Sequence, residues 1–263
     1  MCRFFAYWGT ESRNLNYWLV EAENSLLQQS RNDESNRPNP DGWGFAFRNN
    51  GQIYLVKKVV PAYEDEDFII SAQELRGEMA FAHVRRKSQG DTKVHNTHPF
   101  LHEEWLFMHN GNIPNFPRCK QELTQLLHGN DQIFTKGATD SEFLFKYFIY
   151  WFRKKKSCDA DCILSIINEI LVHIIAITPQ KDFPQLALNF LLSNGHYLIG
   201  FRLHRGLYFL QEKDAVYIAS EPIDRAHHWK EVPENHFLIC QSPTQLELKS
   251  REEVIPREHL LTV

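Results

Sequence analysis

The chain begins MCRFFAYWG (residues 1–9), a cysteine followed by a run rich in aromatic residues. Aromatic side chains favour strands, so we expect a buried β-strand from Arg3 to Trp8. Cys2 is either an ordinary buried cysteine or the first residue of the mature chain once Met1 is removed. In the second case one residue carries a thiol and a free α-amine, and the amine can serve as the base that activates the thiol.

Composition is that of a globular protein. Of 263 residues, 43% are hydrophobic and 24% are charged, with a net charge of −4. A negative net charge does not indicate a protein that binds nucleic acid. The longest apolar segment, Cys162–Ile177, is interrupted by polar residues and too short for a bilayer, so we expect a buried helix and no membrane partner. The first residues do not have the pattern of a secretory signal, so we expect none. We therefore expect one cytoplasmic domain over residues 1–263, or 2–263 after loss of Met1.

The order of strand and helix patterns predicts the fold class. Strand-like segments occur at 3–8, 43–48, 53–57, 79–84 and 105–108. Helical periodicity fits 15–29, 68–75, 119–128, 141–153, 162–177 and 186–192. After residue 194 the pattern is typical of an antiparallel meander, and 31–41 is the predicted long loop. This order favours an α+β sandwich of antiparallel sheets covered by helices.

The stretch HVRRKSQG (83–90) follows the apolar strand segment MAFA. An arginine just beyond a buried strand offers a bidentate fork for a carboxylate. Strand alternation puts His83 and Arg85 on one side and Arg86 on the other, so Arg85 is the candidate ligand. A surface arginine without a ligand is the alternative interpretation.

The stretch FMHNGNIPNF (107–116) contains an Asn-Gly pair, which is normally a tight turn. No strand pattern follows it, because Pro114 and Pro117 lead into a helix. The side-chain amide of Asn110 and the backbone N–H of Gly111 make a compact pair of donors, as an oxyanion hole requires.

The stretch GATDSEFLF (137–145) has the pattern of a helix start. Thr139 or Asp140 would serve as N-cap, with the acidic Glu142 in the first turn. Capping alone would explain these residues. Asp140 could equally receive an ammonium group from a ligand.

Taken in order, M-C at the start, NPDGWGFA, HVR, NTHPF, HNG and TDSE resemble the class II glutamine amidotransferases, which are N-terminal-nucleophile hydrolases. The resemblance implies a four-layer αββα sandwich of two antiparallel sheets, with neither cofactor nor metal. It implies Cys2 as nucleophile and base, and Asn110 and Gly111 as the oxyanion hole. By the same resemblance Arg85 holds the substrate α-carboxylate and Asp140 its α-ammonium group.

The sequence departs from the synthase members of the family directly after Arg85. They typically carry W-A-T-H-G there, whereas this chain has RKSQG at 86–90. Ser88 is a candidate hydroxyl donor to the substrate carboxylate. With the MCRFFAYWG start and the NTHPF loop, the departure resembles the stand-alone branch that includes γ-glutamyl hydrolases. The 263 residues are about the length of the amidotransferase domain alone.

The resemblance implies hydrolysis of a γ-glutamyl amide, either glutamine or a γ-glutamyl compound, through a γ-glutamyl thioester on Cys2. Ammonia or an amine and glutamate would be released. The expected partner is a small-molecule γ-glutamyl substrate; a synthase partner chain that takes the ammonia, or a homo-oligomer, stays open. Two alternatives remain: a catalytically silent binding or regulatory module, and a metallohydrolase using His95, His98, His102, Glu103 and Glu104, which Pro99 disfavours because it would interrupt a helix.

Overall fold

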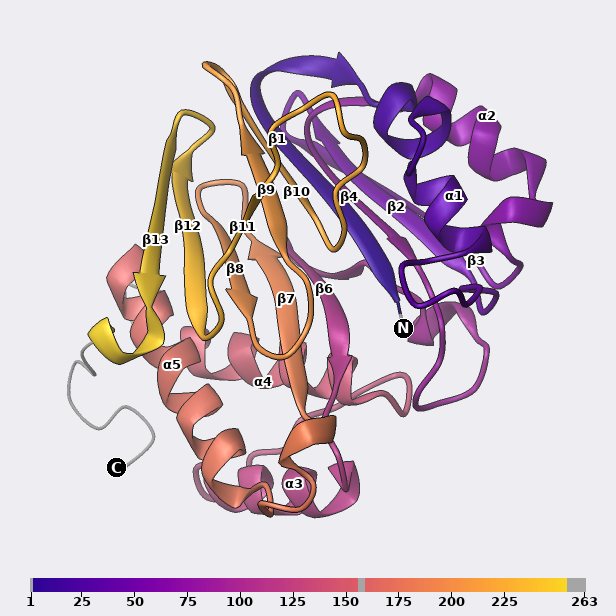
Figure 1. Cartoon of the computed structure of the whole chain (residues 1–263). Coiled ribbons are helices and arrows are strands. Elements are labelled where there is room, and N and C mark those ends of the chain that lie inside the picture. The colour runs from indigo at the N-terminus through magenta and orange to yellow at the C-terminus, as the bar shows by residue number, and fades with distance from the viewer. Residues whose placement is uncertain (1, 156–158, 255–263) are drawn as a thin grey trace.

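The computed structural model describes residues 2–155 and 159–254 (Figure 1). Met1, whose removal the sequence analysis leaves open, lies outside this range. Two antiparallel sheets make up the centre of the fold. The first has the order β11 (Lys230–Glu231), β9 (Tyr208–Gln211), β10 (Ala215–Ala219), β1 (Arg3–Asn14), β4 (Arg76–Val84), β2 (Trp43–Asn49) and β3 (Gln52–Lys58). The second has the order β13 (Gln245–Ser250), β12 (His236–Ser242), β8 (Leu198–Arg202), β7 (Ala187–Ser193), β6 (Trp105–Asn112) and β5 (Phe100–His102).

Helices connect the strands and cover the outer faces of both sheets. The α-helices of the described residues are α1 (Leu26–Arg31), α2 (Glu66–Glu74), α3 (Phe116–Gln125), α4 (Asp140–Arg153) and α5 (Ala160–Ile177). A π-helical turn, η1 (Tyr17–Glu21), precedes α1. Short 3₁₀ turns are η2 (Ala62–Glu64), η3 (Val94–Asn96), η4 (Phe183–Gln185) and η5 (Arg251–Glu253).

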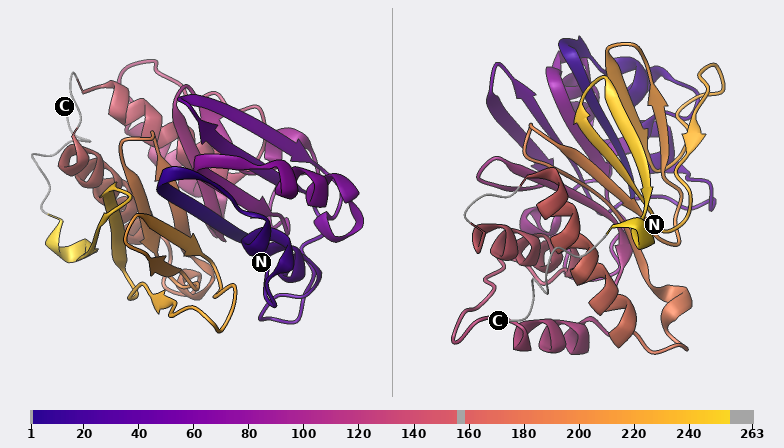
Figure 2. Two further views of the ribbon diagram at one scale, coloured as in Figure 1. Left: turned by 90° about the horizontal axis from the view of Figure 1, so that it is seen from above. Right: turned by 90° about the vertical axis from the view of Figure 1, so that its left-hand side faces the viewer.

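Three hydrophobic clusters hold four layers together. Alternation along β1 sends Phe5 and Tyr7 outward to pack with η1, α1 and α2. Phe4 and Ala6 point the other way and fill the space between the sheets. The outer face of the second sheet packs on α3, α4 and α5 through a third, larger cluster. The views in Figure 2 show these helices on opposite outer faces. The expected αββα sandwich of two antiparallel sheets is confirmed.

The strands and helices expected in the first half of the chain are present, with one interruption. The segment 15–29 is not one helix, because η1 ends at Glu21 and α1 begins only at Leu26. Ser25 caps α1 by accepting a hydrogen bond from the backbone N–H of Gln28. A serine that satisfies the start of a helix in this way favours a boundary over a continuous helix.

The helix expected at 186–192 is wrong, because these residues form β7. All seven residues of β7 are buried, since the inter-sheet core covers one face and the outer helices the other. A strand buried on both faces shows no alternation and cannot be told from a buried helix by periodicity.

The strands after residue 194 are antiparallel, but the expected simple meander is wrong. β8, β12 and β13 join the second sheet, whereas β9 and β10 join the first. In this region the chain therefore crosses from one sheet to the other twice. Local patterns predict strands but not which sheet receives them.

The expected buried helix at 162–177 is confirmed as α5. Among the described residues it is the helix long and apolar enough to cross a membrane by length and composition, yet 56% of it is buried inside the protein. Its apolar side chains belong to the core cluster beneath the second sheet.

Phe81 is fully buried between the two sheets and gives a direct test of the inter-sheet core. Phe81→Ala should lower the free energy of unfolding by about 3–5 kcal/mol, because it removes buried apolar surface and leaves a cavity. Urea unfolding followed by circular dichroism measures this change. Ile70→Ala is the control, since Ile70 is 47% exposed, and should change the free energy by only about 0.5 kcal/mol. Equal losses in the two variants would contradict the layer assignment.

Candidate active site

Strand register brings the candidate residues to one end of the space between the sheets. Arg3 of β1 pairs with Val84 of β4, so Cys2 lies beside Arg85 just beyond the paired ends. Phe4 and Phe81 point between the sheets, and alternation gives Cys2 and Arg85 the same direction. Met108 of β6 also faces this space, and Asn110 follows it on the same side.

The Cys2 thiol is held by the backbone of the residue after Arg85. Its Sγ accepts a hydrogen bond from the N–H of Arg86 at 3.3 Å and lies 3.2 Å from the Arg86 carbonyl oxygen, to which it can donate. Burial raises the pKa of Cys2, against the lowering effects of the Arg86 N–H and of the Arg85 and Arg3 charges. The resting form at neutral pH is therefore the thiol, which needs a base to become a nucleophile.

The guanidinium group of Arg85 is buried and bonded to its own loop. It donates to the carbonyl oxygens of Gln89 at 3.0 Å and Asp91 at 3.1 Å. Within 2–155 and 159–254 no carboxylate forms an ion pair with it, and burial lowers its pKa. A ligand carboxylate that pairs with a buried cation of this kind stabilises the complex.

The segment DGWG (41–44) fixes the backbone of Arg85. The N–H of Arg85 donates to the Gly42 carbonyl oxygen at 2.7 Å, and the Arg85 carbonyl oxygen accepts from the N–H of Asp41 at 2.9 Å. Gly42 has a φ of +120°, and a Cβ there would lie 2.5 Å from the carbonyl oxygen of Lys58. Only glycine suits this turn.

Asn110 and Gly111 belong to β6, which continues beyond the predicted strand end at Met108, so they do not form the tight turn that an Asn-Gly pair normally makes. Asn110 pairs in register with Asn189 of β7. The Asn110 side chain is buried and its Oδ1 has no hydrogen-bond partner among the described residues. A Cβ on Gly111 would lie 2.0 Å from Nε2 of His109, so a larger residue cannot replace it without movement.

Gln89 joins three parts of the site. Its side-chain Nε2 lies 3.2 Å from Asn112 Oδ1, 3.2 Å from the Ile113 carbonyl oxygen and 3.4 Å from Asp140 Oδ2. Its backbone carbonyl accepts from Arg85, as described above. The buried cation and the carboxylate of Asp140 are therefore connected through one residue. The sequence analysis noted Gln89 only as part of the RKSQG departure and gave it no role.

Asp140 opens α4 and is buried at its N-terminal end. Thr139 is the N-cap, accepting from the N–H of Glu142, so the sequence prediction of a capped helix start is confirmed. Asp140 Oδ2 accepts from the N–H of Ile113 at 2.8 Å, and Oδ1 from the N–H of Ser141 at 2.8 Å. The end of β6 and the start of α4 are thus tied to each other. Ser88, by contrast, is exposed and contributes to a cavity wall beside Asn110.

Residues 25–213 match the sequence profile described as class II glutamine amidotransferases. The chain belongs to this family. A probable glutamine amidotransferase of Saccharomyces cerevisiae is 32% identical over 161 residues, covering 57% of this chain and 45% of the yeast protein. A γ-glutamyl-hercynylcysteine sulfoxide hydrolase of Mycolicibacterium smegmatis is 28% identical over 243 residues, covering 90% of this chain and 95% of that protein.

Solved structures agree with the family assignment at the level of the fold. A protein of Silicibacter pomeroyi described as a glutamine aminotransferase class-II domain protein has a TM-score of 0.66 at 21% identity, covering 95% of this chain and 99% of that one. The glutamine phosphoribosylpyrophosphate amidotransferase of Bacillus subtilis has a TM-score of 0.65 at 18% identity, covering 95% of this chain and 49% of that one. This chain spans about half the length of the curated relatives from yeast and Haemophilus influenzae, 45% and 51%.

The resemblance on which the sequence analysis relied is confirmed. The relatives named above are called a glutamine amidotransferase and a γ-glutamyl-compound hydrolase.

Three buried histidines of the amidotransferase lie behind the candidate site. His83 and His98 stack with ring centroids 4.3 Å apart, and none of their ring nitrogens has a hydrogen-bond partner among the described residues. Burial lowers the pKa of His83 to about 3 and that of His98 well below its usual value. Burial also lowers the pKa of His109, whose Nδ1 lies 2.9 Å from the Ser141 hydroxyl. This region is therefore neutral at physiological pH.

The alternative of a metal site on His95, His98, His102, Glu103 and Glu104 gains no support, because the described residues contain no group of three or more His, Cys, Asp or Glu placed to hold an ion. His98 stacks on His83, and Nδ1 of His102 lies 2.8 Å from the ammonium group of Lys146. An ammonium group only donates, so His102 accepts there and is neutral.

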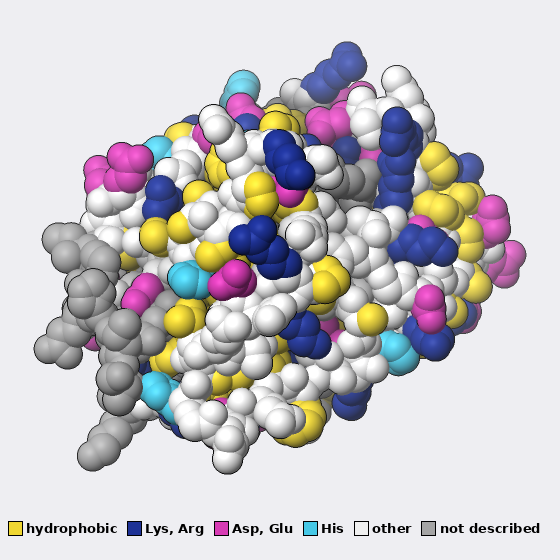
Figure 3. All heavy atoms as spheres, turned by 90° about the horizontal axis from the view of Figure 1, so that it is seen from below, with side chains coloured by type: hydrophobic (Ala, Val, Ile, Leu, Met, Phe, Trp, Pro, Cys, Tyr) yellow, Lys and Arg dark blue, Asp and Glu magenta, His cyan; other side chains and the backbone are white. Residues whose placement is uncertain are grey.

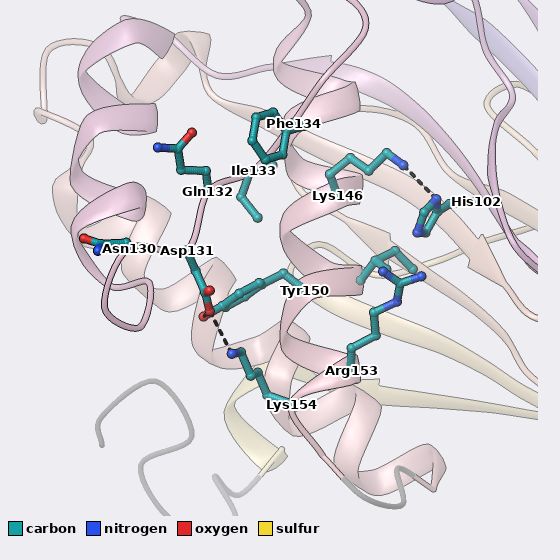
Figure 4. A pocket seen from close by; sticks show the side chains of 11 residues that line it. His102, Asn130, Asp131, Gln132, Ile133, Phe134, Lys146, Tyr150, Arg153 and Lys154 are labelled. Atoms are coloured by element: carbon teal, nitrogen blue, oxygen red, sulfur yellow. Dashed lines mark hydrogen bonds and ion pairs between the residues drawn. The ribbon is translucent and has the colours of Figure 1, made fainter.

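A hollow of about 870 Å³ lies between the 130–134 loop and α4 (Figure 4). Its polar groups are largely paired with one another, as Lys146 is with His102 and Lys154 with Asp131. None of Cys2, Arg85, Asn110 and Asp140 lines it. On the face of the amidotransferase seen in Figure 3, basic and acidic side chains are interspersed, so that face has no single-sign field to steer a charged ligand.

The depressed pKa of His83 makes stability pH-dependent. In the unfolded chain a histidine has a pKa of about 6.5, so between that value and about 3 the unfolded state holds the extra proton. The stabilisation is complete above the unfolded pKa and is lost as pH falls. We expect His83→Leu to reduce the loss of unfolding free energy between pH 7 and pH 5 by about 1–2 kcal/mol, measured by urea unfolding. His228→Gln, at an exposed histidine, should lose as much unfolding free energy between pH 7 and pH 5 as the wild type does. The same loss in His83→Leu would contradict this explanation.

Proposed function

We propose that this amidotransferase hydrolyses the γ-amide bond of glutamine or another γ-glutamyl compound, with Cys2 as nucleophile after Met1 is removed. The observation that carries the proposal is the arrangement around Gln89. A buried guanidinium without a carboxylate partner and a buried carboxylate lie on either side of it, and the thiol lies beside the guanidinium. These are the opposite charges that an α-amino acid head group requires.

The position of Gln89 Nε2 supports the binding of an ammonium group. Its three acceptors are Asn112 Oδ1, the Ile113 carbonyl oxygen and Asp140 Oδ2, at 3.2–3.4 Å. An amide nitrogen has two hydrogens, whereas an ammonium group has three and a positive charge. A substrate ammonium group would satisfy the same three acceptors better than Gln89 does, and Asp140 would neutralise its charge. The α-carboxylate would then pair with Arg85.

The chemistry follows from the two groups on Cys2. The α-amine takes the thiol proton, and the thiolate attacks the γ-carbonyl carbon. The oxyanion that forms is stabilised by the amide of Asn110 and the N–H of Gly111. Its collapse breaks the C–N bond, and the α-ammonium group gives its proton to the leaving amine, leaving a γ-glutamyl thioester. Water, deprotonated by the same amine, attacks the thioester; the C–S bond breaks, glutamate leaves and the thiol is restored.

A diazoketone analogue of glutamine tests the nucleophile, because it alkylates an activated thiol. We expect intact mass to show one adduct, and peptide mass to place it on Cys2 of chains that begin at residue 2. Cys119 and Cys240 are the internal controls, since both are buried free thiols whose pKa is raised by burial. Cys2→Ala should abolish labelling and lower kcat for glutamine hydrolysis by at least about 10³-fold.

Chains that keep Met1, take no label and release no ammonia from glutamine would contradict the proposed hydrolysis. The result would favour the alternative of a catalytically silent binding module on the same fold.

Arg85→Lys tests the carboxylate contact. Lysine keeps the charge but loses the two-pronged geometry, so KM for glutamine should rise about tenfold with a smaller change in kcat. An amide substrate that lacks the α-carboxylate should be hydrolysed equally slowly by the wild type and by Arg85→Lys. This comparison separates the loss of carboxylate recognition from a general loss of activity. Arg118→Lys, on the exposed side of α3, is the matched control and should behave as wild type. A loss that is equal for both substrates would argue against this role for Arg85.

A further inference from the structure

A cavity of about 360 Å³ lies near the thiol, because Arg86, which holds Sγ, is one of its lining residues. Arg86, whose backbone contacts Sγ, and Asn110 form its near wall. Its far wall includes Arg205 and Gly206, which lead into β9. Neither Arg85 nor Asp140 lines it. In the first sheet β1 lies between β4 and β10, so Cys2 separates the β4 side, with Arg85, from the side of β9 and β10.

This position fixes which part of a substrate the cavity would hold. If the glutamyl head group lies between Arg85 and Asp140 and its γ-carbonyl carbon lies at Sγ, the group beyond the amide nitrogen extends past Asn110. Asn110 is also a lining residue of the cavity. Ammonia is about the size of a water molecule, roughly 30 Å³, and would leave such a space almost empty. The volume of about 360 Å³ instead falls near the lower end of the ~300–1,000 Å³ of small-molecule pockets.

The lining of the cavity is strongly basic. Glu34 is the acidic residue of the lining. The basic residues of the lining are Arg3, Arg37, Arg86, Lys87 and Arg205. Two of the cations are compensated, since Arg3 pairs with Asp33 at 3.2 Å and with Glu221, and Lys87 lies 3.7 Å from Asp41. Glu34 itself is 3.5 Å from Arg3.

Arg37 and Arg86 are the cations available to a ligand. Neither guanidinium forms an ion pair or a hydrogen bond with any side chain in the part of the chain that the structure describes. Arg37 is exposed at the cavity rim, and Arg86 is half-buried beside the thiol. Two arginines that line one cavity from different loops favour an anion with planar oxygens, such as a carboxylate.

We infer that the preferred substrate carries a carboxylate on its leaving group, so that the released amine is an amino acid or a peptide rather than ammonia, and that Arg37 and Arg86 bind this carboxylate. The inference rests on the proposed γ-glutamyl hydrolysis and adds a second, specificity-determining subsite to it. Arg85 and Asp140 recognise the glutamyl part in every substrate. Arg37 and Arg86 distinguish one leaving group from another.

Three compounds test the inference with the full chain: glutamine, γ-glutamylglycine and γ-glutamylglycinamide. The last two differ by one charge at nearly constant size. A charge-assisted contact at a partly exposed site is worth about 1.4 kcal/mol, so kcat/KM should be about tenfold higher for the acid than for the amide. Raising the ionic strength should reduce this ratio, because salt screens exposed charges.

Variants assign the effect to the two arginines. In Arg37→Gln and Arg86→Gln the ratio of kcat/KM for acid over amide should fall toward one. Arg225→Gln is the matched control, because Arg225 is 95% exposed and does not line the cavity, and its ratio should equal that of the wild type.

The outcomes separate the two levels of the proposal. Turnover of all three compounds with equal kcat/KM for acid and amide would overturn the leaving-group subsite and leave γ-glutamyl hydrolysis intact. A preference that survives in both arginine variants would overturn the assignment to Arg37 and Arg86. Absence of turnover with every compound would contradict the proposed function, and the inference with it.

Discussion

The candidate site depends on the register between β1 and β4. Because Arg3 is opposite Val84, the residue before one strand meets the residues after the other, and the Cys2 thiol is held by the backbone of Arg86. Side chains alternate along a strand, so a slip of one residue would turn Cys2 out of the inter-sheet space. The two hydrogen bonds from the DGWG segment to Arg85 hold the end of β4 in this register. Hydrophobic packing on both faces of the sheet makes the slip costly, since Phe4 and Phe5 would exchange environments.

A second constraint is the need to keep charged groups satisfied away from water. A buried guanidinium or carboxylate without hydrogen bonds is strongly destabilising. Arg85 meets this need with backbone carbonyl oxygens of its own loop, and Asp140 with backbone N–H groups of β6 and α4. The loops therefore fold around the charges, and the charges order the loops. The three neutral histidines behind them add no competing charge.

Sequence reasoning predicted the layers, the family and the placement of Cys2, Arg85, Asn110 and Asp140 on particular strand and helix ends. These features depend on local patterns: aromatic strands, an N-cap and short motifs. It failed where the deciding contact is distant in sequence. β7 has a uniformly apolar sequence because two layers cover it, and the last strands divide between sheets according to packing that no local pattern encodes. Gln89 has three acceptors on β6 and α4, which only the folded chain brings together. The roles of the site residues remain predictions.

On the proposed function, the position of Gln89 has a consequence for which ligands would bind. A ligand must displace an amide that already bonds Asn112, Ile113 and Asp140, and must also compete with the Gln89 carbonyl oxygen for Arg85. A simple carboxylic acid or a simple amine replaces only half of these contacts and leaves the other half to rearrange at a cost. A molecule that carries both groups on one carbon replaces them together. If the proposed function holds, this exchange of hydrogen bonds would select against acids or amines that carry only one of the two groups.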